Sequence, residues 1–344
     1  MDKYKYQVSI LVPIYNVEAY IERCVRSLFE QTFQSIEYVF IDDCSPDKSL
    51  QILKKIILEY PNKKDSIKII CNENNLGIGF VRNQAISVAR GKFVLYVDSD
   101  DFIVNNAVEL LYNEAVLNKA DIVTADFYLY YDENNKTYLS YKPKTNPLSF
   151  VSQLVEKRIP SYLCNKLIRI SLYEKHDIKV PPGINFMEDF STLPRLVFYS
   201  KKIVTVSYPL YYYQQNRYSY CNNLTAKSID SAFKSIETIE SFLINNYPDI
   251  NKYAISINIC KLQTKLMLTY AAPKYANIIC SHYDNIYDAN ALNNFNFRER
   301  ILLHFISKKD FKKINNTVKY MKLLSFIKTK LLLILNKTIN VITC

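Results

Sequence analysis

The stretch Tyr96-Val97-Asp98-Ser99-Asp100-Asp101 places three carboxylates directly after a run of apolar residues. The run begins at Phe93, behind Gly91, and its aromatic, β-branched and aliphatic side chains predict a buried strand. Such a strand brings negative charge to the edge of a sheet, where open α/β folds bind ligands. A divalent cation (Mg2+ or Mn2+) with a phosphate-bearing ligand would relieve the repulsion between the carboxylates. The alternative is a solvated acidic turn that caps the next helix.

Strand and helix patterns alternate four times in the N-terminal part of the chain. The predicted strands cover residues 8–13, 38–41, 67–71 and 93–97, and the predicted helices cover 18–31, 49–59 and 79–90. Short links between such elements are typical of a mostly parallel sheet with helices on both faces. Asp42 and Asp43 end the second strand as Asp98 and Asp100 follow the fourth, so both acidic groups should share one edge. A nucleotide fits this edge, with one carboxylate on its base or ribose and another holding a metal on its phosphates.

The rest of the chain contains fewer clear patterns. We expect a helix over 104–118, a strand over 121–125, a hairpin over 128–141, a helix over 187–197 and closing strands over 203–206 and 210–213. A polar stretch over 216–223 indicates a boundary, and helical patterns follow it. The sequence thus predicts an α/β domain over residues 1–220 and a helical C-terminal region over 221–344.

Two further motifs carry chemistry, and each has a structural alternative. Gly77 and Gly79 form a Gly-x-Gly, but Arg82 stands where the dinucleotide-binding fingerprint has its third glycine, which disfavours an NAD-dependent oxidoreductase. Arg82 would lie in the first turn of a helix and contact a phosphate or a base, or it is a solvated arginine. Glu188 and Asp189 lie among apolar residues, where a carboxylate could have a raised pKa and act as a general base; helix capping is the alternative.

Bulk properties narrow the class of protein. The 344 residues include eight cysteines without metal-ligand spacing, so we expect free, mostly buried thiols of a reducing compartment. We recognise neither a secretory signal nor an apolar run of membrane-spanning length, which predicts a cytoplasmic protein or one on the inner face of a membrane. From Arg298 onward 11 Lys and Arg residues face only Glu299 and Asp310.

This basic tail interleaves lysines with large aliphatic residues between Lys322 and Leu335. It predicts a basic amphipathic helix that makes peripheral contact with an anionic membrane, or a C-terminal helix docked on its own domain. Nucleic acid is disfavoured as a partner, since no recognition motif accompanies the charge.

Five motifs in order resemble family 2 glycosyltransferases with the GT-A fold. They are Val12-Pro13-Ile14-Tyr15-Asn16, Ile41-Asp42-Asp43-Cys44-Ser45-Pro46-Asp47, Asn75-Leu76-Gly77 with Arg82-Asn83 and Ala89-Arg90-Gly91, Asp98-Ser99-Asp100-Asp101, and Glu188-Asp189. The resemblance covers roughly Val8 to Asn216. It implies inverting transfer of a sugar from a nucleotide-diphosphate donor, commonly UDP-linked, to a hydroxyl of a glycan or lipid-linked acceptor in surface polysaccharide synthesis.

The resemblance also implies a role for each matching residue. Pro13 and Tyr15 would border the base, Asp43 would contact uracil with support from Asp42, and Arg82 and Ser99 belong to the donor site. Asp98, toward the ribose, and Asp100, toward the Mn2+ or Mg2+ ion, form the DxD pair, while Asp101 orders their loop. Asp189 matches the base that deprotonates the acceptor. Glu188, Lys166 and Tyr213-Gln214-Gln215-Asn216 fall where such enzymes line acceptor or pyrophosphate sites.

Two positions depart from the family pattern, and two other functions predict features that this sequence does not have. Cys44 replaces a usual glycine and Val81 a usual small residue, which we interpret as local packing changes. A nucleotidyltransferase would need a glycine-rich, lysine-bearing N-terminal loop, which the segment from Val12 to Val17 lacks. A catalytically inactive nucleotide-sugar-binding subunit predicts the loss of Asp100 or Asp189, and both are present.

Overall fold

The computed structural model describes residues 4–216, 223–247 and 251–325. The chain divides into two compact units, Met1–Asn223 with Lys234–Pro248, and Leu224–Phe233 with Asp249–Cys344. We describe each unit by itself.

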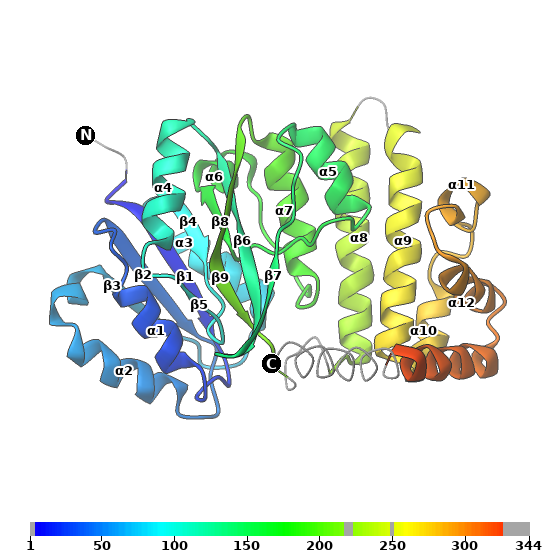
Figure 1. Cartoon of the computed structure of the whole chain (residues 1–344), viewed down its shortest axis with the longest axis horizontal. Coiled ribbons are helices and arrows are strands. Elements are labelled where there is room, and N and C mark those ends of the chain that lie inside the picture. Colours follow the sequence, from blue (N-terminus) through cyan, green and yellow to red (C-terminus); the bar gives the residue numbers. More distant parts are fainter. Residues whose placement is uncertain (1–3, 217–222, 248–250, 326–344) are drawn as a thin grey trace, which may run out of the picture. The chain divides into compact units, whose positions relative to one another are not determined.

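The N-terminal part of the first unit is a parallel sheet (Figure 1). Its strands are β1 (Tyr6–Ile14), β2 (Ile36–Asp42), β3 (Ile67–Cys71) and β4 (Gly91–Tyr96), in the order β3-β2-β1-β4. The helices that connect them are α1 (Ile21–Phe29), α2 (Ser49–Glu59), the 3-10 turn η1 (Pro61–Ser66) and α3 (Ile78–Val88). The predicted alternation of strand and helix is therefore confirmed here. β1 and β2 are rich in apolar residues because the sheet buries them on both faces.

Beyond β4 the sheet becomes mixed, and the expectation of a mostly parallel sheet holds only for the first four strands. The remaining strands are β5 (Phe102–Ile103), β6 (Ile122–Asp132), β7 (Asn135–Leu139), β8 (Lys166–Arg169) and β9 (Ile203–Gln214). β8 pairs antiparallel with both β4 and β6, while β9 runs parallel to β6. The predicted hairpin is confirmed as β6–β7. The two closing strands predicted near the end are one strand, β9, whose pairing shifts register near Pro209.

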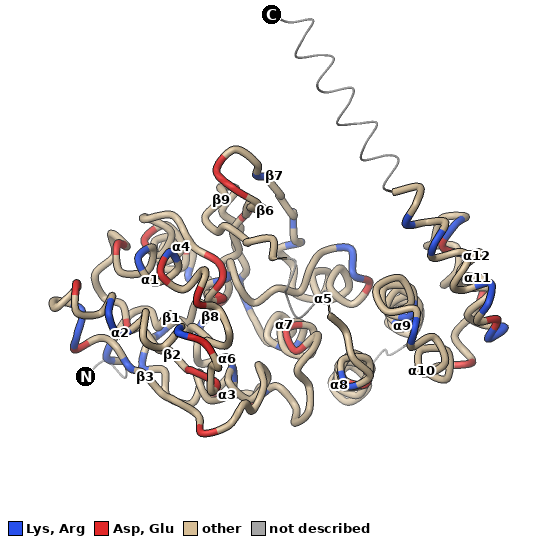
Figure 2. The backbone as a smooth tube through the Cα atoms, turned by 90° about the horizontal axis from the view of Figure 1, so that it is seen from below, with Lys and Arg blue, Asp and Glu red and all other residues tan. Residues whose placement is uncertain are grey.

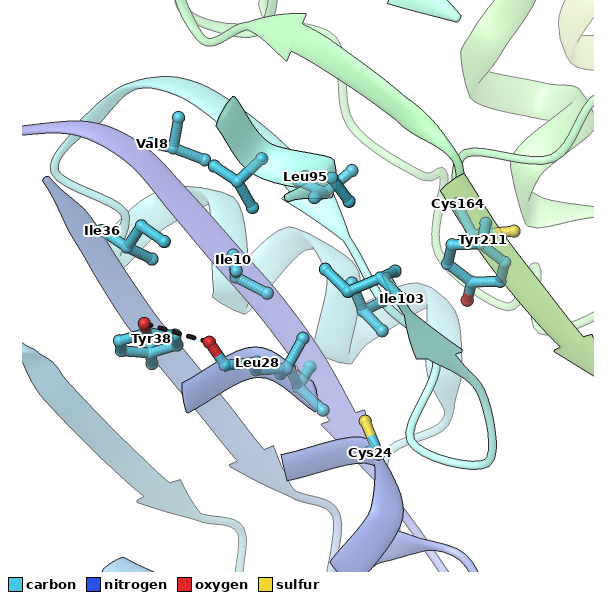
Figure 3. Close-up of a cluster of buried hydrophobic side chains, with 14 of the residues drawn as sticks. Val8, Ile10, Cys24, Leu28, Ile36, Tyr38, Leu95, Ile103, Cys164 and Tyr211 are labelled. Carbon is cyan, nitrogen blue, oxygen red and sulfur yellow. Dashed lines mark hydrogen bonds between the residues drawn. The ribbon is translucent and has the colours of Figure 1, made fainter. Parts of the chain in front are cut away.

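Helices α4 to α7 complete this unit. They are α4 (Ala107–Leu117), α5 (Pro147–Val155), α6 (Ser171–His176) and α7 (Glu188–Tyr199), and α8 (Ala226–Asn246) follows. The apolar faces of the first helices and strands form one core, part of which Figure 3 shows. Within it the Tyr38 hydroxyl donates to the Leu28 carbonyl at 3.1 Å, so a polar atom in this core keeps a partner. Of the six described cysteines, four are buried and all six are free, as expected.

A buried charge also lies in the sheet. The carboxylate of Glu37 on β2 accepts from the hydroxyl of Ser9 on β1 at 2.5 Å, and from the backbone N–H and Nε of Arg90 at 2.7 and 2.6 Å. The Ser9 hydroxyl accepts from the N–H of Gly91, which begins β4, at 2.8 Å. A Cβ on Gly91 would lie 2.4 Å from the Ser9 nitrogen, so this approach requires glycine. The Glu37 carboxylate is thus held by Ser9 of the neighbouring strand and by Arg90, the residue before β4.

The second unit is helical. It contains the first residues of α8, then α9 (Asn251–Ala271), η3 (Pro273–Tyr275), α10 (Ala276–Ser281), α11 (Ala289–Leu292) and α12 (Phe297–Ser307), and residues 311–325 are helical as well. Asn296 and Glu299 form a capping box at the start of α12. Lys265 lies in the interior of this unit, where its ammonium group donates to the carbonyls of His282 and Cys280.

Basic residues follow α12 in the part of the tail that the structure describes, as Figure 2 shows. Residues 326–344, which carry most of the predicted amphipathic segment, lie outside the described residues. No helix within the described ranges has the length and apolar composition needed to span a bilayer.

Candidate active site

The carboxyl ends of β1, β2 and β4 meet at one edge of the sheet. β1 pairs in parallel with both neighbours, with Ile14 opposite Asp42 and Leu11 opposite Tyr96. The acidic residues that follow β2 and β4 therefore lie on the same edge, as the sequence predicts. The edge is also where ligands bind in open α/β sheets.

Asp43 holds the loop that leads into α3. Its carboxylate accepts from the backbone N–H groups of Leu76 and Gly77 at 3.0 and 2.8 Å, and from the Asn72 side chain at 2.9 Å. Asp43 is buried, so these donors satisfy a carboxylate that water barely reaches. Asp42, also buried, accepts from the N–H of Ser45. Cys44, which follows Asp43, has a left-handed backbone with φ +61°. This conformation explains why a glycine suits the position.

Two predicted donor-site residues border this loop. Tyr15 follows β1 and is 48% exposed, and Pro13 is half-buried. An exposed tyrosine ring at the end of a central strand offers a flat apolar surface to a ligand.

The loop after β4 is ordered by Asp101, as expected. Asp101 is fully buried and accepts from the Tyr211 hydroxyl at 2.6 Å and from the Gln214 N–H at 2.7 Å. The Tyr211 hydroxyl in turn accepts from the N–H of Asp98 at 3.1 Å. Ser99 is buried, while Asp98 and Asp100 are half-buried and face the edge of the sheet. Asp101 thus fixes the backbone from which the other two carboxylates project.

The acidic loop has the donor chemistry of a cation site. Burial, followed by the charge of Asp98, raises the pKa of Asp100 to about 6. Among the described residues, ligand atoms of Asp98, Asp101 and Cys164 lie within 4.8 Å of one another. Asp101 already accepts two hydrogen bonds, and burial raises the pKa of the Cys164 thiol. A hard cation prefers oxygen ligands to a protonated thiol. The pair Asp98 and Asp100 therefore fits Mg2+ or Mn2+ better than the group that includes Cys164.

Arg82 joins the acidic loop to the start of α7. Its guanidinium lies 3.4 Å from Asp98, 3.2 Å from Glu188 and 3.3 Å from Asp189, and stacks over the Tyr96 ring at 4.9 Å. Arg82 is 4% exposed, so the predicted alternative of a solvated arginine is wrong. One of its terminal nitrogens, Nη1, is buried without a hydrogen-bond partner among the described residues. An unpaired buried donor is costly, so this atom is a candidate contact for a bound ligand.

The two carboxylates at the start of α7 differ in their partners. Asp189 Oδ2 accepts from the Leu163 N–H at 3.0 Å, whereas buried Oδ1 has the Arg82 ion pair but no hydrogen bond of good geometry. Burial raises the pKa of Asp189, and burial together with the charge of Asp189 raises the pKa of Glu188 to about 7. Met187, directly before them, has a left-handed backbone with φ +61°, a strained conformation of the kind found at functional sites.

The Gly-x-Gly of α3 has a packing role that sequence reasoning missed. A Cβ on Gly79 would lie 2.1 Å from the Ile184 carbonyl oxygen. The backbone N–H of Gly79 donates to the Asn185 side chain at 3.0 Å. The Asn83 side chain makes two hydrogen bonds of 2.8 Å to the backbone N–H and C=O of Val180. These contacts hold the segment that leads to Glu188 and Asp189 against α3. The signal available in the sequence was the pair of glycines and Asn83, all within the motif that contains Arg82.

Comparison with known proteins now decides the family. Residues 9–178 match the model of glycosyl transferase family 2. A Bacillus subtilis protein named as the glycosyltransferase EpsH is 32% identical over 70% of this chain and 70% of its own length. This chain belongs to glycosyl transferase family 2.

Other relatives of this family 2 chain agree with the observed fold. TarS of Staphylococcus aureus, named a poly(ribitol-phosphate) beta-N-acetylglucosaminyltransferase, is 31% identical over 61% of this chain and 35% of its own length. A crystal structure of its residues 1–349 with UDP-GlcNAc covers 92% of this chain and 91% of that chain, with a TM-score of 0.68 and 22% identity. A Pyrobaculum calidifontis mannosyltransferase in complex with GDP-Man and Mn2+ has a TM-score of 0.51, 14% identity and coverage of 92% and 85%. The predicted GT-A fold with a helical C-terminal region is confirmed.

The structure brings four residues that the sequence singled out in this family 2 member together in one ion-paired group, in which Arg82 pairs with Asp98, Glu188 and Asp189. Lys166 is buried and donates to the Tyr162 carbonyl and the Asn165 side chain, and burial lowers its pKa to about 8.

Proposed function

We propose that this chain is an inverting, metal-dependent glycosyltransferase of cell-surface polysaccharide synthesis with a UDP-sugar donor. The observation that carries the proposal is the ion-paired group around Arg82, which joins Asp98 of the acidic loop to Asp189, the carboxylate that we assign as general base. Such a group brings the donor and acceptor sides of one reaction together. The polysaccharide class comes from two relatives named as poly(ribitol-phosphate) glycosyltransferases, one of them TarS, and the UDP-sugar comes from the TarS complex.

On the donor side, we assign the nucleotide to the edge between Tyr15, Asp43 and Asp98. Pro13 and Tyr15 would offer an apolar surface for the base. Asp43 uses three acceptor positions on the loop before α3 and would accept one more hydrogen bond from the base, with Asp42 as support. The buried Nη1 of Arg82 would donate to the diphosphate. Asp98 and Asp100 would hold the divalent ion, which would offset the charge on the departing diphosphate.

On the acceptor side, Asp189 would take the proton of the attacking hydroxyl. The hydroxyl oxygen forms a bond to the anomeric carbon as the bond from that carbon to the diphosphate oxygen breaks, and Asp189 keeps the proton. Its raised pKa suits this transfer, and the ion pair with Arg82 keeps the carboxylate charged beforehand. One base and no enzyme nucleophile give inversion of configuration. We propose that the acceptor is a hydroxyl of a glycan or of a lipid-linked sugar. We propose separately that the enzyme acts in the cytoplasm and that its tail makes peripheral contact with the membrane.

The test combines binding and turnover. UDP should raise the melting temperature of the wild type in the presence of Mn2+ and not in EDTA, because a ligand that binds only the folded state stabilises it. Asp100→Asn should lose this shift. Asp189→Asn should keep the UDP-induced shift. With UDP-GlcNAc as donor and poly(ribitol phosphate) or neutral oligosaccharides as acceptors, it should release UDP at least about 100-fold more slowly than the wild type. Asp65→Asn, an exposed carboxylate of the same unit, is the matched control.

The same experiment separates the enzyme from a catalytically inactive binding subunit. A metal-dependent UDP shift with no turnover for any donor and acceptor would favour the inactive subunit. Normal turnover by Asp189→Asn would exclude Asp189 as the base.

A further inference from the structure

A row of aromatic rings crosses one face of the sheet at β7, β6, β9 and β5. Tyr128 on β6 lies opposite Tyr138 on β7 and Tyr212 on β9, and Tyr212 lies opposite Phe102 on β5. The ring centroids are 5.9, 5.2 and 4.4 Å apart along this row, with the last two pairs stacked. Because alternate residues of a strand share a face, this side differs from the one that packs into the core.

A second row lies two residues further along the strands, toward the active-site edge. Tyr130 and Gln214 are opposite each other on β6 and β9, and the Tyr130 ring packs edge-on against both Tyr212 and Phe102. The Arg23 guanidinium of α1 lies 4.2 Å from the Phe102 ring and donates to Gln214 Oε1 at 2.5 Å. Because the Gln214 N–H holds Asp101, this row is continuous with the acidic loop.

Each row borders a hollow. A cavity of about 480 Å³ lies beside Arg23, with Tyr131, Asp132 and Gln215 among its lining residues. A smaller one of about 240 Å³ lies beside Tyr128, Tyr212 and exposed Tyr208. The larger hollow has the size of an ordinary small-molecule site, roughly 300–1,000 Å³. Tyr130 and Tyr128 occupy successive positions on the same side of β6, so the two hollows are neighbours.

The lining chemistry matches a neutral sugar. Tyrosine rings present flat faces to the C–H side of a pyranose, while amide, guanidinium and carboxylate groups hydrogen-bond its hydroxyls. A lipid chain would remove Arg23 and Asp132 from water without giving either a new polar partner, which is costly. Arg23 and Asp132 carry opposite charges, so this hollow offers no net positive charge to an anionic polymer. Lys136 covers the Tyr128 and Tyr212 rings at 5.4 and 5.7 Å, but it is exposed and can move into water when a sugar ring replaces it.

We propose that this aromatic face is an extended saccharide-binding track. The hollow beside Arg23 takes the acceptor sugar units nearer the acidic loop, and the hollow beside Tyr208 takes units further along the same glycan. This inference rests on the proposed function and adds to it that the acceptor is a neutral glycan chain rather than a lipid-linked single sugar.

Oligosaccharides of two lengths test the track. The probes are cellobiose and cellotetraose, N,N′-diacetylchitobiose and its tetramer, and ribitol 5-phosphate, each titrated by saturation-transfer NMR. At least one neutral tetramer should bind more tightly than its dimer. Tyr131→Ala should weaken both lengths about tenfold, as expected for one lost stacking contact, and Tyr208→Ala should weaken only the tetramer. Tyr320→Ala replaces a tyrosine of the other unit that is also more than one-third exposed, and it should change neither affinity.

Several outcomes would overturn the track. They are binding of neither neutral series, binding of ribitol 5-phosphate alone, equal affinity for dimer and tetramer, or affinities that Tyr131→Ala and Tyr208→Ala leave unchanged. The UDP thermal shift with Mn2+ is recorded on the same samples. A retained shift without saccharide binding contradicts the track alone, whereas a missing shift contradicts the proposed function.

Discussion

Replacing Gly79 with alanine should separate catalysis from folding. The new Cβ would lie 2.1 Å from the Ile184 carbonyl oxygen and 2.9 Å from Val180 Cγ1, whereas ordinary contact begins at 3.4 Å. The carbonyl belongs to the backbone, so the segment must move by about 1 Å rather than rotate a side chain away. Overpacking of this kind costs about 1–3 kcal/mol, and the better helix propensity of alanine returns up to about 1 kcal/mol.

The effect on the rate should be larger than the effect on stability. The displaced segment leads to Glu188 and Asp189, and a shift of about 1 Å in a catalytic group can reduce the rate about 100-fold. The assays are urea unfolding and UDP release, with kcat and KM measured separately. Gly183→Ala is the control, because φ +80° strains an alanine there while the nearest atom is 4.0 Å away. A Gly79→Ala enzyme with normal kcat, or a Gly183→Ala enzyme with the same loss, would refute the reasoning.

Three other substitutions have defined outcomes. Arg82→Gln leaves three half-buried carboxylates without their cation and should lower the free energy of unfolding by about 3 kcal/mol in urea titrations; an unchanged midpoint would contradict this. Cys44→Gly should be about 1 kcal/mol more stable than Cys44→Ala, because only glycine adopts φ +61° without strain; equal stability of the two variants would count against that strain. Burial lowers the pKa of Lys265 to about 8, so between about pH 8 and 10 the unfolded state binds more protons at this residue. Between these pH values the free energy of unfolding of the wild type, relative to that of Lys265→Met, should therefore rise by at most about 1.4 kcal/mol per pH unit in urea unfolding. A difference that does not change with pH would exclude the lowered pKa of Lys265.

The sequence predicted those parts of the fold and site that depend on local patterns. Apolar runs that end in acidic residues located β2 and β4, and their alternation with helices placed Asp42 and Asp98 on one edge. Pairings between distant segments had no such signal. Arg82 and Glu188 are 106 residues apart in the chain, and only the folded structure brings them together.

Other features of the fold and the site could not be predicted from the sequence for related reasons. The sequence predicted two closing strands, over 203–206 and 210–213, yet β9 continues through Pro209 because a shift in its pairing with β6 accommodates the proline. Arg23 looks like any polar residue of an amphipathic helix. Its contact with Phe102 and Gln214 depends on where α1 packs, which residue spacing does not specify.

The buried Glu37 has a consequence for how related sequences can diverge. The Ser9 hydroxyl donates to Glu37 and accepts from the N–H of Gly91. Replacing Glu37 with an apolar residue therefore leaves this hydroxyl without its acceptor, and adding a side chain at Gly91 displaces Ser9. The three positions should therefore change together among descendants of one ancestor. Lineages that have lost the acid should carry an apolar partner at the serine position, and a single replacement should persist only briefly before the second follows.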